Sequence, residues 1–95
     1  MKSLEVCRRE IDRIDLEMAQ LFKQRLALVS EIAEIKSLMN VPILDEQRES
    51  QVLERVRQAV EDPVLSADFE HVMRQIMRIS RRRQKEILEG RTSHG

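Results

Sequence analysis

The sequence predicts an all-α protein of three helices, the first of which is very long. Between Ser3 and Met39 the chain contains neither proline nor glycine, the two residues that most often interrupt a helix. Charged residues make up 36% of the chain, hydrophobic residues make up 41%, and tryptophan and tyrosine are absent, which is typical of helices with a salt-bridged surface. Apolar residues recur in the long segment at the a and d positions of a heptad, and we call this set the heptad seam. Its members are Leu4, Cys7, Ile11, Ile14, Met18, Leu21, Leu28, Ile32, Ile35 and Met39.

The length of this first helix predicts a dimer. At about 1.5 Å per residue, the segment 3–39 would be roughly 55 Å long. A compact domain of 95 residues would have a diameter of about 30 Å. The rest of the chain therefore cannot cover the whole seam. We expect a second copy of the same chain to cover it, in an obligate homodimer.

Turn and cap residues divide the rest of the chain into two shorter helices. Asn40 and Pro42 end the first helix, because the residue before a proline is pushed out of the helical region. Asp45 is suited to cap the start of the second helix, and Ser66 is suited to cap the third. We expect a single domain, 1–95, with helices at about 3–39, 45–60 and 66–89 and a polar tail at 90–95.

Polar residues interrupt the apolar face of each predicted helix. The heptad requires an apolar residue between Met18 and Ile32, where the sequence has Arg25. The second helix turns charged residues toward the side of its apolar stripe, which is formed by Val52, Val56, Ala59 and Val60. Local rules that fail in coordinated places often mark a functional site, so we expect these residues to converge on one polar pocket. They are Arg25 and Lys36 in the first helix, Asp45, Arg48 and Glu49 in the second, and Ser80 and Gln84 in the third.

The residue types in this set limit the chemistry of the pocket. Arginine and lysine bind carboxylates or phosphate, glutamine and serine form hydrogen bonds with oxygen, and a carboxylate can accept a hydroxyl group. The sequence has one cysteine, no acidic cluster and no glycine-rich phosphate loop, which argues against nucleophilic or metal chemistry. The pattern favours binding of a small polyanion, or catalysis by electrostatics and positioning alone.

Each residue also has a simpler interpretation. Arg25 could pair with a glutamate across a dimer seam and set its register. Ser80 could bond a backbone carbonyl of its own helix, Asp45 could be only a cap, and Arg48 and Glu49 could face solvent. Only the coincidence across three helices favours a site.

Composition argues against nucleic-acid and membrane partners. The formal net charge is zero, and the basic run at 81–85 has no interleaved aromatic residues for stacking on bases. We interpret that run as a solvated helix face. The N-terminus lacks the pattern of a signal peptide, and no apolar stretch approaches the length of a membrane span. We therefore expect a cytoplasmic protein.

The polar pattern resembles the all-helical class of chorismate mutases, over about residues 4–88. The residues that carry the resemblance are Arg8-x-x-Ile11-Asp12-x-Ile14-Asp15, Arg25, Lys36, Pro42-x-x-Asp45-x-x-Arg48-Glu49 and Ser80-x-x-x-Gln84. The resemblance implies an intertwined homodimer, a six-helix bundle with two identical active sites. It also implies the rearrangement of chorismate to prephenate in the phenylalanine and tyrosine branch of the shikimate pathway, without a cofactor.

The resemblance further implies a role for each residue of the pattern. Arg25, with Arg8 from the other chain, would hold the two carboxylates of the substrate. Lys36 would contact a carboxylate and the ether oxygen of the breaking bond, to which Gln84 would donate a second hydrogen bond. The remaining residues would bind the ring hydroxyl (Glu49 and Asp45) or complete the network around the carboxylates (Ser80 and Arg48).

The register of the third helix depends on a loop one residue shorter than in well-known relatives. Without that gap, Arg81 and Lys85 would take the places of Ser80 and Gln84. We favour the gapped register, because Ser80 and Gln84 lie on the inward stripe whereas Arg81 and Lys85 point outward.

Helix geometry supports the shared site independently of the resemblance. Arg8 precedes Arg25 by 17 residues, or roughly 25 Å along a helix, which no small ligand spans. If Arg8 is functional, an antiparallel partner must deliver it to the other chain's pocket.

Three alternative functions remain open at the level of the sequence. The nearest is an isochorismate-pyruvate lyase of the same fold. The intact Asp45-x-x-Arg48-Glu49 pattern favours the mutase, because the lyase branch lacks this glutamate. The second is a non-catalytic helical dimerisation module. The third is a mutase that depends on a regulatory complex with another shikimate enzyme.

Overall fold

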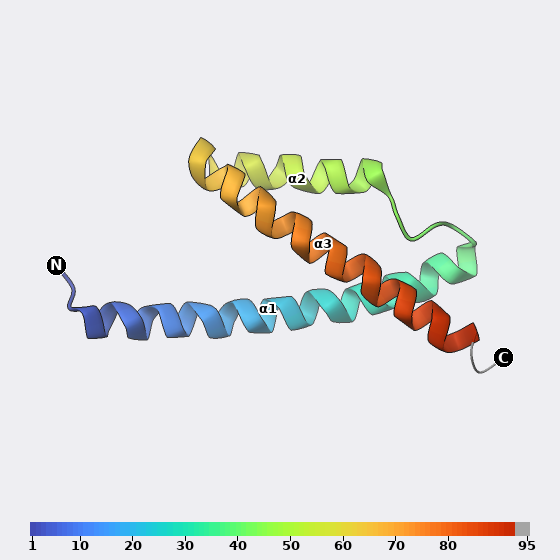
Figure 1. Cartoon of the computed structure of the whole chain (residues 1–95), viewed down its shortest axis with the longest axis horizontal. Helices are drawn as coiled ribbons and strands as arrows, with labels where there is room; N and C mark the ends of the chain where they lie inside the picture. Colours follow the sequence, from blue (N-terminus) through green and yellow to red (C-terminus); the bar gives the residue numbers. More distant parts are fainter. Residues whose placement is uncertain (93–95) are drawn as a thin grey trace.

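The computed structural model describes residues 1–92 and consists, over this range, of three helices joined by short connections. They are α1 (Leu4–Met39), α2 (Glu46–Val60) and α3 (Pro63–Thr92), as Figure 1 shows. The all-α prediction is therefore confirmed. The chain is elongated, with principal extents of 60 × 28 × 15 Å and a radius of gyration of 17.1 Å. A compact domain of this length would have a radius of about 12 Å.

Both ends of α1 lie where the sequence predicts them. The Oγ atom of Ser3 accepts a hydrogen bond from the backbone N–H of Val6 at 3.1 Å, which satisfies one of the unpaired donors of the first turn. Asn40 ends the helix in the left-handed conformation, at φ 60°. The following N–H, from Val41, donates to the carbonyl of Lys36 at 3.0 Å. Asparagine tolerates this conformation better than most residues.

The predicted start of α2 is confirmed, but the predicted start of α3 is wrong. Asp45 caps α2 by accepting a hydrogen bond from Arg48 N at 3.0 Å. The cap of α3 is Asp62 and not Ser66, because Asp62 Oδ1 accepts from Val64 N at 2.9 Å and from Leu65 N at 3.2 Å. Pro63 fits the first helical position, where its missing N–H would have no partner within the helix.

The predicted polar tail also begins too early. Helix α3 continues through 90–92, because one glycine costs only about 1 kcal/mol in a helix and cannot end it alone. The rest of the predicted tail, 93–95, lies outside the described residues.

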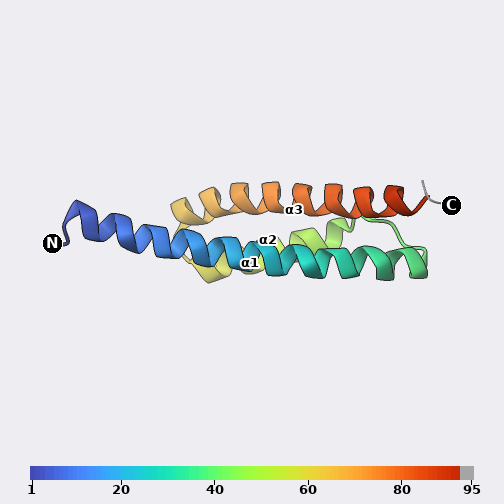
Figure 2. The same cartoon turned by 90° about the horizontal axis from the view of Figure 1, so that it is seen from below.

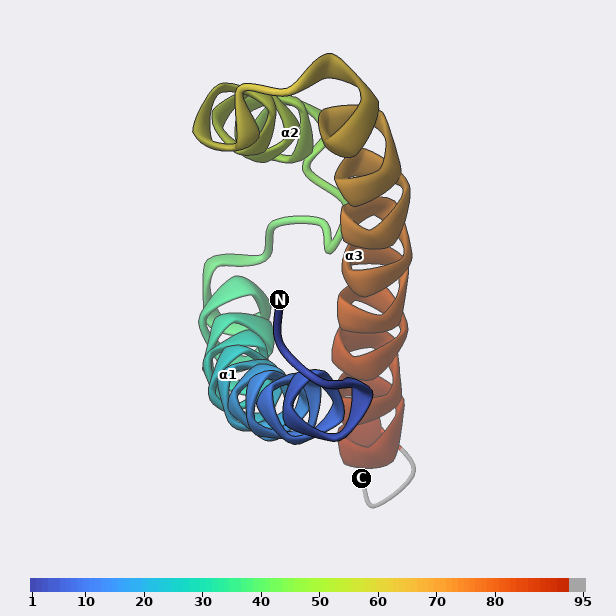
Figure 3. The same cartoon turned by 90° about the vertical axis from the view of Figure 1, so that its left-hand side faces the viewer.

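Helix α3 is the central element of the fold. It packs against α1 and against α2, whereas α1 and α2 do not pack on each other in the described residues. Seen end-on, α1 and α2 both lie beside α3 (Figure 3). The buried apolar residues are correspondingly few: Val29 and Ala33 on α1, Leu53 on α2, and Met73 and Met77 on α3. On α2 the predicted stripe is only partly correct, because Leu53 is buried and Ala59 is exposed.

The heptad seam of α1 is left largely uncovered by its own chain. Its apolar side chains stay exposed, including Leu4 at 65%, Ile11 at 54% and Leu21 at 63%. Helix α1 meets α3 through a different face, on which Val29 and Ala33 lie. The first turns of α1 also project beyond the end of α3 (Figure 2). The long helix therefore has two apolar faces, and its own chain covers only one of them.

No helix in the described residues is both long enough and apolar enough to span a membrane.

Candidate active site

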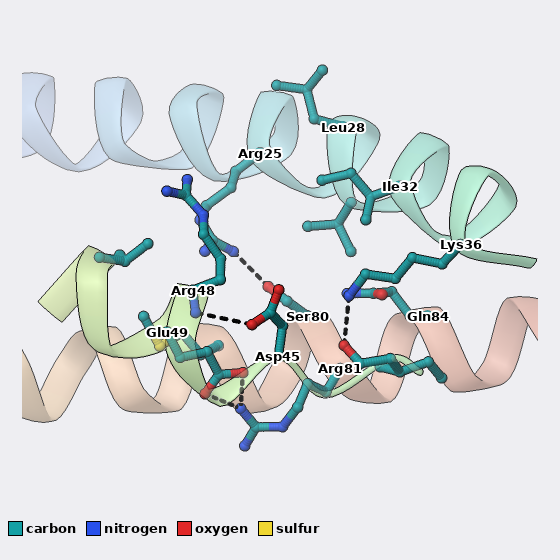
Figure 4. Close-up of a pocket in the computed structure, with 14 residues that line it drawn as sticks. Arg25, Leu28, Ile32, Lys36, Asp45, Arg48, Glu49, Ser80, Arg81 and Gln84 are labelled. Atoms are coloured by element: carbon teal, nitrogen blue, oxygen red, sulfur yellow. Dashed lines mark hydrogen bonds and ion pairs between the residues drawn. The ribbon is translucent and has the colours of Figure 1, made fainter. Parts of the chain in front are cut away.

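A pocket of about 330 Å³ is lined by all three helices and by the linker between α1 and α2 (Figure 4). The structure brings together in it every predicted site residue except Arg8. These residues are Arg25, Lys36, Asp45, Arg48, Glu49, Ser80 and Gln84. Apolar side chains complete the wall, among them Leu28, Ile32 and Met77. The expectation that the polar interruptions of three helices meet in one place is confirmed.

Arg25 and Ser80 connect α1 to α3 inside the pocket. Arg25 Nη1 donates a hydrogen bond to Ser80 Oγ, and Ser80 Oγ donates to the carbonyl oxygen of Ile76 at 2.8 Å. Burial lowers the pKa of the Arg25 guanidinium, the charge of Arg48 lowers it further, and Glu49 opposes both effects. An arginine so placed remains charged near neutral pH. The pocket therefore contains an oriented cation.

Lys36 and Gln84 both line the pocket, at the end away from Arg25 in Figure 4. Lys36 Nζ donates to the carbonyl oxygen of Ile43 in the linker, at 2.5 Å. Gln84 is only 6% exposed, and its Oε1 atom is buried without a hydrogen-bond partner among the described residues. An unsatisfied buried acceptor destabilises the folded state by about 1–3 kcal/mol. The stability of the fold therefore gives no reason to have a glutamine at this position. The amide therefore has hydrogen-bonding capacity that its own chain does not use.

The first turn of α2 contributes charged groups of both signs. Asp45 caps the helix and also lines the pocket, so its structural interpretation and its site interpretation both hold. Arg48 and Glu49 follow in the same turn, and Glu49 forms an ion pair with Arg81 of α3, in which Arg81 Nη1 lies 2.6 Å from Glu49 Oε1. This turn therefore faces the pocket and not only solvent.

Arg81 is a pocket residue that the sequence interpretation missed. We predicted that Arg81 and Lys85 point outward, and for Arg81 this prediction is wrong. Arg81 lines the pocket, because a long side chain one residue after buried Ser80 can reach back over the rim. Lys85 does point outward, with a side chain that is 71% exposed. Ser80 and Gln84 are buried at 6% each, as the favoured register requires.

Arg8 does not line the pocket of its own chain. It is exposed on the N-terminal part of α1, roughly 25 Å from Arg25 along the helix. If Arg8 is functional, it must therefore act in the pocket of another chain, and this stays a prediction.

The charges of the pocket define what it can bind. Four cationic and two anionic side chains line it, which leaves a net charge of +2. Apolar side chains line the rest of the pocket, and no group of three or more potential metal ligands occurs in the described part of the chain. The fold and the site thus define an all-helical protein with a cationic pocket suited to a small, partly apolar dianion.

The chain belongs to the family described as chorismate mutase type II, whose model matches residues 7–85. It is similar to the T-protein of Haemophilus influenzae, with 41% identity over 81 residues, which cover 84% of this chain and 22% of that protein. It is also similar to the chorismate mutase of Methanocaldococcus jannaschii, with 35% identity over 57 residues, covering 60% of this chain and 58% of that protein.

Two further similarities extend the comparison. The bifunctional chorismate mutase/prephenate dehydratase of Aquifex aeolicus is 43% identical over 56 residues, which cover 59% of this chain and 16% of that protein. The chain therefore spans between 16% and 58% of the length of these relatives. Among solved structures, a conserved hypothetical protein from Pyrococcus furiosus is similar with a TM-score of 0.73 and 32% identity. That similarity covers 88% of this chain and 97% of the other.

Proposed function

We propose that this chain is a chorismate mutase, which rearranges chorismate to prephenate in the pocket between α1, α2 and α3. One observation carries the proposal: in a chain of this family, the seven polar residues of the predicted pattern line a single pocket. The reaction is intramolecular and requires neither a nucleophile nor a general acid or base. It requires that the enolpyruvyl arm be held over the ring and that negative charge developing on the ether oxygen be stabilised.

Arg25 holds one substrate carboxylate in this proposal. A guanidinium has five N–H donors, and only the bond from Nη1 to Ser80 engages Arg25 within the pocket network. Ser80 therefore fixes the direction of the guanidinium while other donors remain available to the substrate. Arg48 adds a second positive charge nearby. Holding the flexible arm in this way removes rotational freedom before the reaction begins.

Lys36 and Gln84 stabilise the ether oxygen of the breaking bond. The ammonium group of Lys36 has three donors, one of which is used by Ile43, so two can serve the substrate. The Nε2 group of Gln84 donates the second hydrogen bond to the same oxygen. Each preorganised donor of this kind is worth roughly 3 kcal/mol of transition-state stabilisation.

The first turn of α2 binds the ring hydroxyl. Glu49 is the acceptor for the hydroxyl proton, because a carboxylate offers about four lone-pair positions and Arg81 occupies only one side of it. Asp45 completes the polar environment of the ring from the end of the linker, where its cap bond to Arg48 N holds it.

We propose that a second copy of the chain completes the pocket in a homodimer. The exposed heptad seam supports this, because apolar side chains exposed at 42% to 65% along most of a helix favour burial. The distance between Arg8 and Arg25 supports it independently. In the dimer, the partner's Arg8 binds the second carboxylate of the substrate.

Product identification tests the proposed function. The protein is incubated separately with chorismate and with isochorismate, and the products are identified by mass spectrometry. Prephenate from chorismate is the expected result. Salicylate from isochorismate would instead assign the lyase activity of the same fold.

A binding measurement accompanies the product assay. Affinity for a bicyclic diacid that resembles the transition state is measured by calorimetry. If neither substrate is converted and the diacid does not bind, the chain is a non-catalytic dimerisation module, and Arg25→Met should then stabilise the dimer. Weak conversion that rises when another shikimate enzyme is added would identify a partner-dependent mutase.

A further inference from the structure

The ion pair between Glu49 and Arg81 connects α2 to α3 at the rim of the pocket (Figure 4). Arg81 Nη1 contacts both carboxylate oxygens of Glu49, at 2.6 Å from Oε1 and 2.5 Å from Oε2. The two side chains are 32% and 27% exposed, so this pair is better shielded from water than the exposed pairs along α3. Of the basic run at 81–83, only Arg81 lines the pocket.

The electrostatics of the pocket give this pair a function beyond joining two helices. A carboxylate beside a site for a dianion repels the ligand, and the repulsion is strengthened by partial burial. Without Arg81, the net charge of the lining side chains would fall from +2 to +1, and Glu49 would face the substrate uncompensated. With Arg81, the carboxylate retains its hydrogen-bond acceptors while its charge is offset.

We propose that Arg81 is a positioning residue for substrate recognition. It holds Glu49 in place as the acceptor for the ring hydroxyl and offsets its negative charge, so that a substrate with two carboxylates and a neutral hydroxyl binds beside it. This inference rests on the proposed function, since it concerns the same pocket and the same substrate. It adds Arg81 to the residues of α3 that serve substrate binding, beyond the Ser80-x-x-x-Gln84 pattern.

A purely structural ion pair makes a different prediction from a pair that tunes recognition. If Arg81 only joins α2 to α3, its removal lowers thermal stability and leaves the KM for chorismate unchanged. If it offsets the charge of Glu49, its removal raises KM, because the repulsion acts on the bound substrate and on the transition state alike. Replacing Glu49 by glutamine in the same chain then removes the repulsion and lowers KM again.

The experiment compares Arg81→Met, Arg81→Lys, Glu49→Gln and the double variant Glu49→Gln/Arg81→Met. Arg82→Met is the matched control, because Arg82 is the next residue, is 69% exposed and pairs with Glu86 of its own helix. For each variant, kcat and KM for chorismate are measured, with the Kd of the bicyclic diacid as a readout independent of turnover. Thermal unfolding confirms that each variant is folded.

We expect Arg81→Met to raise KM by about tenfold or more with a smaller change in kcat. Arg81→Lys should recover most of the loss, because it retains the charge. The double variant should have a KM close to that of Glu49→Gln alone, because Arg81 acts through Glu49. Arg82→Met should match the wild type in both constants.

The results separate failure of this inference from failure of the proposed function. Wild-type KM and Kd in Arg81→Met would overturn the inference and leave the mutase intact, as would losses that simply add in the double variant. A wild-type protein that neither converts chorismate nor binds the diacid would overturn both. If Arg81→Met does not fold, Arg81→Gln and Arg81→Lys decide the question through the same constants.

Discussion

Arg25 and Ser80 are 55 positions apart in the sequence, and Nη1 of the arginine donates a hydrogen bond to Oγ of the serine. The same hydroxyl donates to the carbonyl of Ile76 one turn earlier in α3, so Ser80 acts as both a hydrogen-bond acceptor and a donor. Arg25 occupies a position of the α1 seam that requires an apolar residue, and this bond orients its guanidinium into the pocket. The bond joins α1 to α3 at one position along their length. Lys36 and Gln84 lie further along the same two helix faces.

Lys36 is the residue whose loss should most directly impair catalysis. We expect Lys36→Ala to reduce kcat by at least about a hundredfold, because it removes a preorganised cation from the ether oxygen. The variant should remain folded, since Lys36 contributes only one bond to the linker, to Ile43. Lys23→Ala, an exposed lysine on the same helix, serves as the control. Turnover of chorismate near the wild-type rate in Lys36→Ala would contradict the assigned role.

Mixing inactive variants tests whether Arg8 acts in the pocket of the other chain. Arg8→Ala and Lys36→Ala are each expected to be inactive as homodimers. In a mixed dimer, the pocket of the Arg8→Ala chain retains its own Lys36 and receives Arg8 from its partner. After subunits are exchanged by unfolding and refolding together, about a quarter of the wild-type activity should return if pairing is random.

A second mixture controls for that result. Lys36→Ala mixed with Gln84→Ala should recover nothing, because both residues lie in the same pocket and every mixed pocket keeps one defect. Equal recovery in the two mixtures, or none in either, would show that Arg8 does not act across the dimer.

Gln84 is expected to show a trade between stability and activity. Its Oε1 atom is buried without a partner in the described residues, so Gln84→Met removes an unsatisfied acceptor at nearly constant volume. We expect a thermal midpoint that is unchanged or higher by a few degrees, about 4–8 °C per kcal/mol for a domain of this size. The same variant should lose at least about tenfold in kcat, because the donor to the ether oxygen is gone.

The control for Gln84 is Gln75→Met, an exposed glutamine on the same helix. It should leave both measurements unchanged. A lower midpoint in Gln84→Met would mean that Gln84 stabilises the fold of the protein and is not an unused binding group.

Glu70 should make the stability of the α2–α3 pair depend on pH. Desolvation tends to raise the pKa of its carboxyl, but hydrogen bonds from Arg57 and Arg74, with their positive charges, hold this pKa below its ordinary value. A lowered pKa means that the folded state binds the proton more weakly than the unfolded state. The stabilisation is therefore present above the unfolded pKa and is lost as the pH falls through the folded one.

We expect Glu70→Gln to lower the thermal midpoint at pH 7, and we expect this difference to shrink as the pH falls and to disappear below the pKa of the folded state. Glu86→Gln, which removes an exposed pair within α3, should have a smaller effect at pH 7. A difference for Glu70→Gln that persists undiminished at low pH would contradict the role of the charged carboxylate.

Much of the site could be predicted because its signals are local and periodic. Arg25 and Lys36 share a helix face by spacing alone, as do Ser80 and Gln84, and Asp45 is recognisable as a cap. The Glu49–Arg81 pair could not be predicted, because its partners are 32 residues apart and Arg81 follows the buried position by one. The start of α3 was misplaced because two residues near it, Asp62 and Ser66, could both serve as caps.

The sequence by itself determined that the chain is helical, where α1 ends, and that Arg25 shares a helix face with Lys36 and Ser80 with Gln84, because these follow from capping and helical periodicity. Only the tertiary structure decided that α3 packs against both of the other helices and that Arg81 lines the pocket. Helix α1 could place either of two apolar faces against α3. The packing of α1 on α3 buries the face of Val29 and Ala33. No local pattern determines this choice, because the contact joins segments far apart in the sequence.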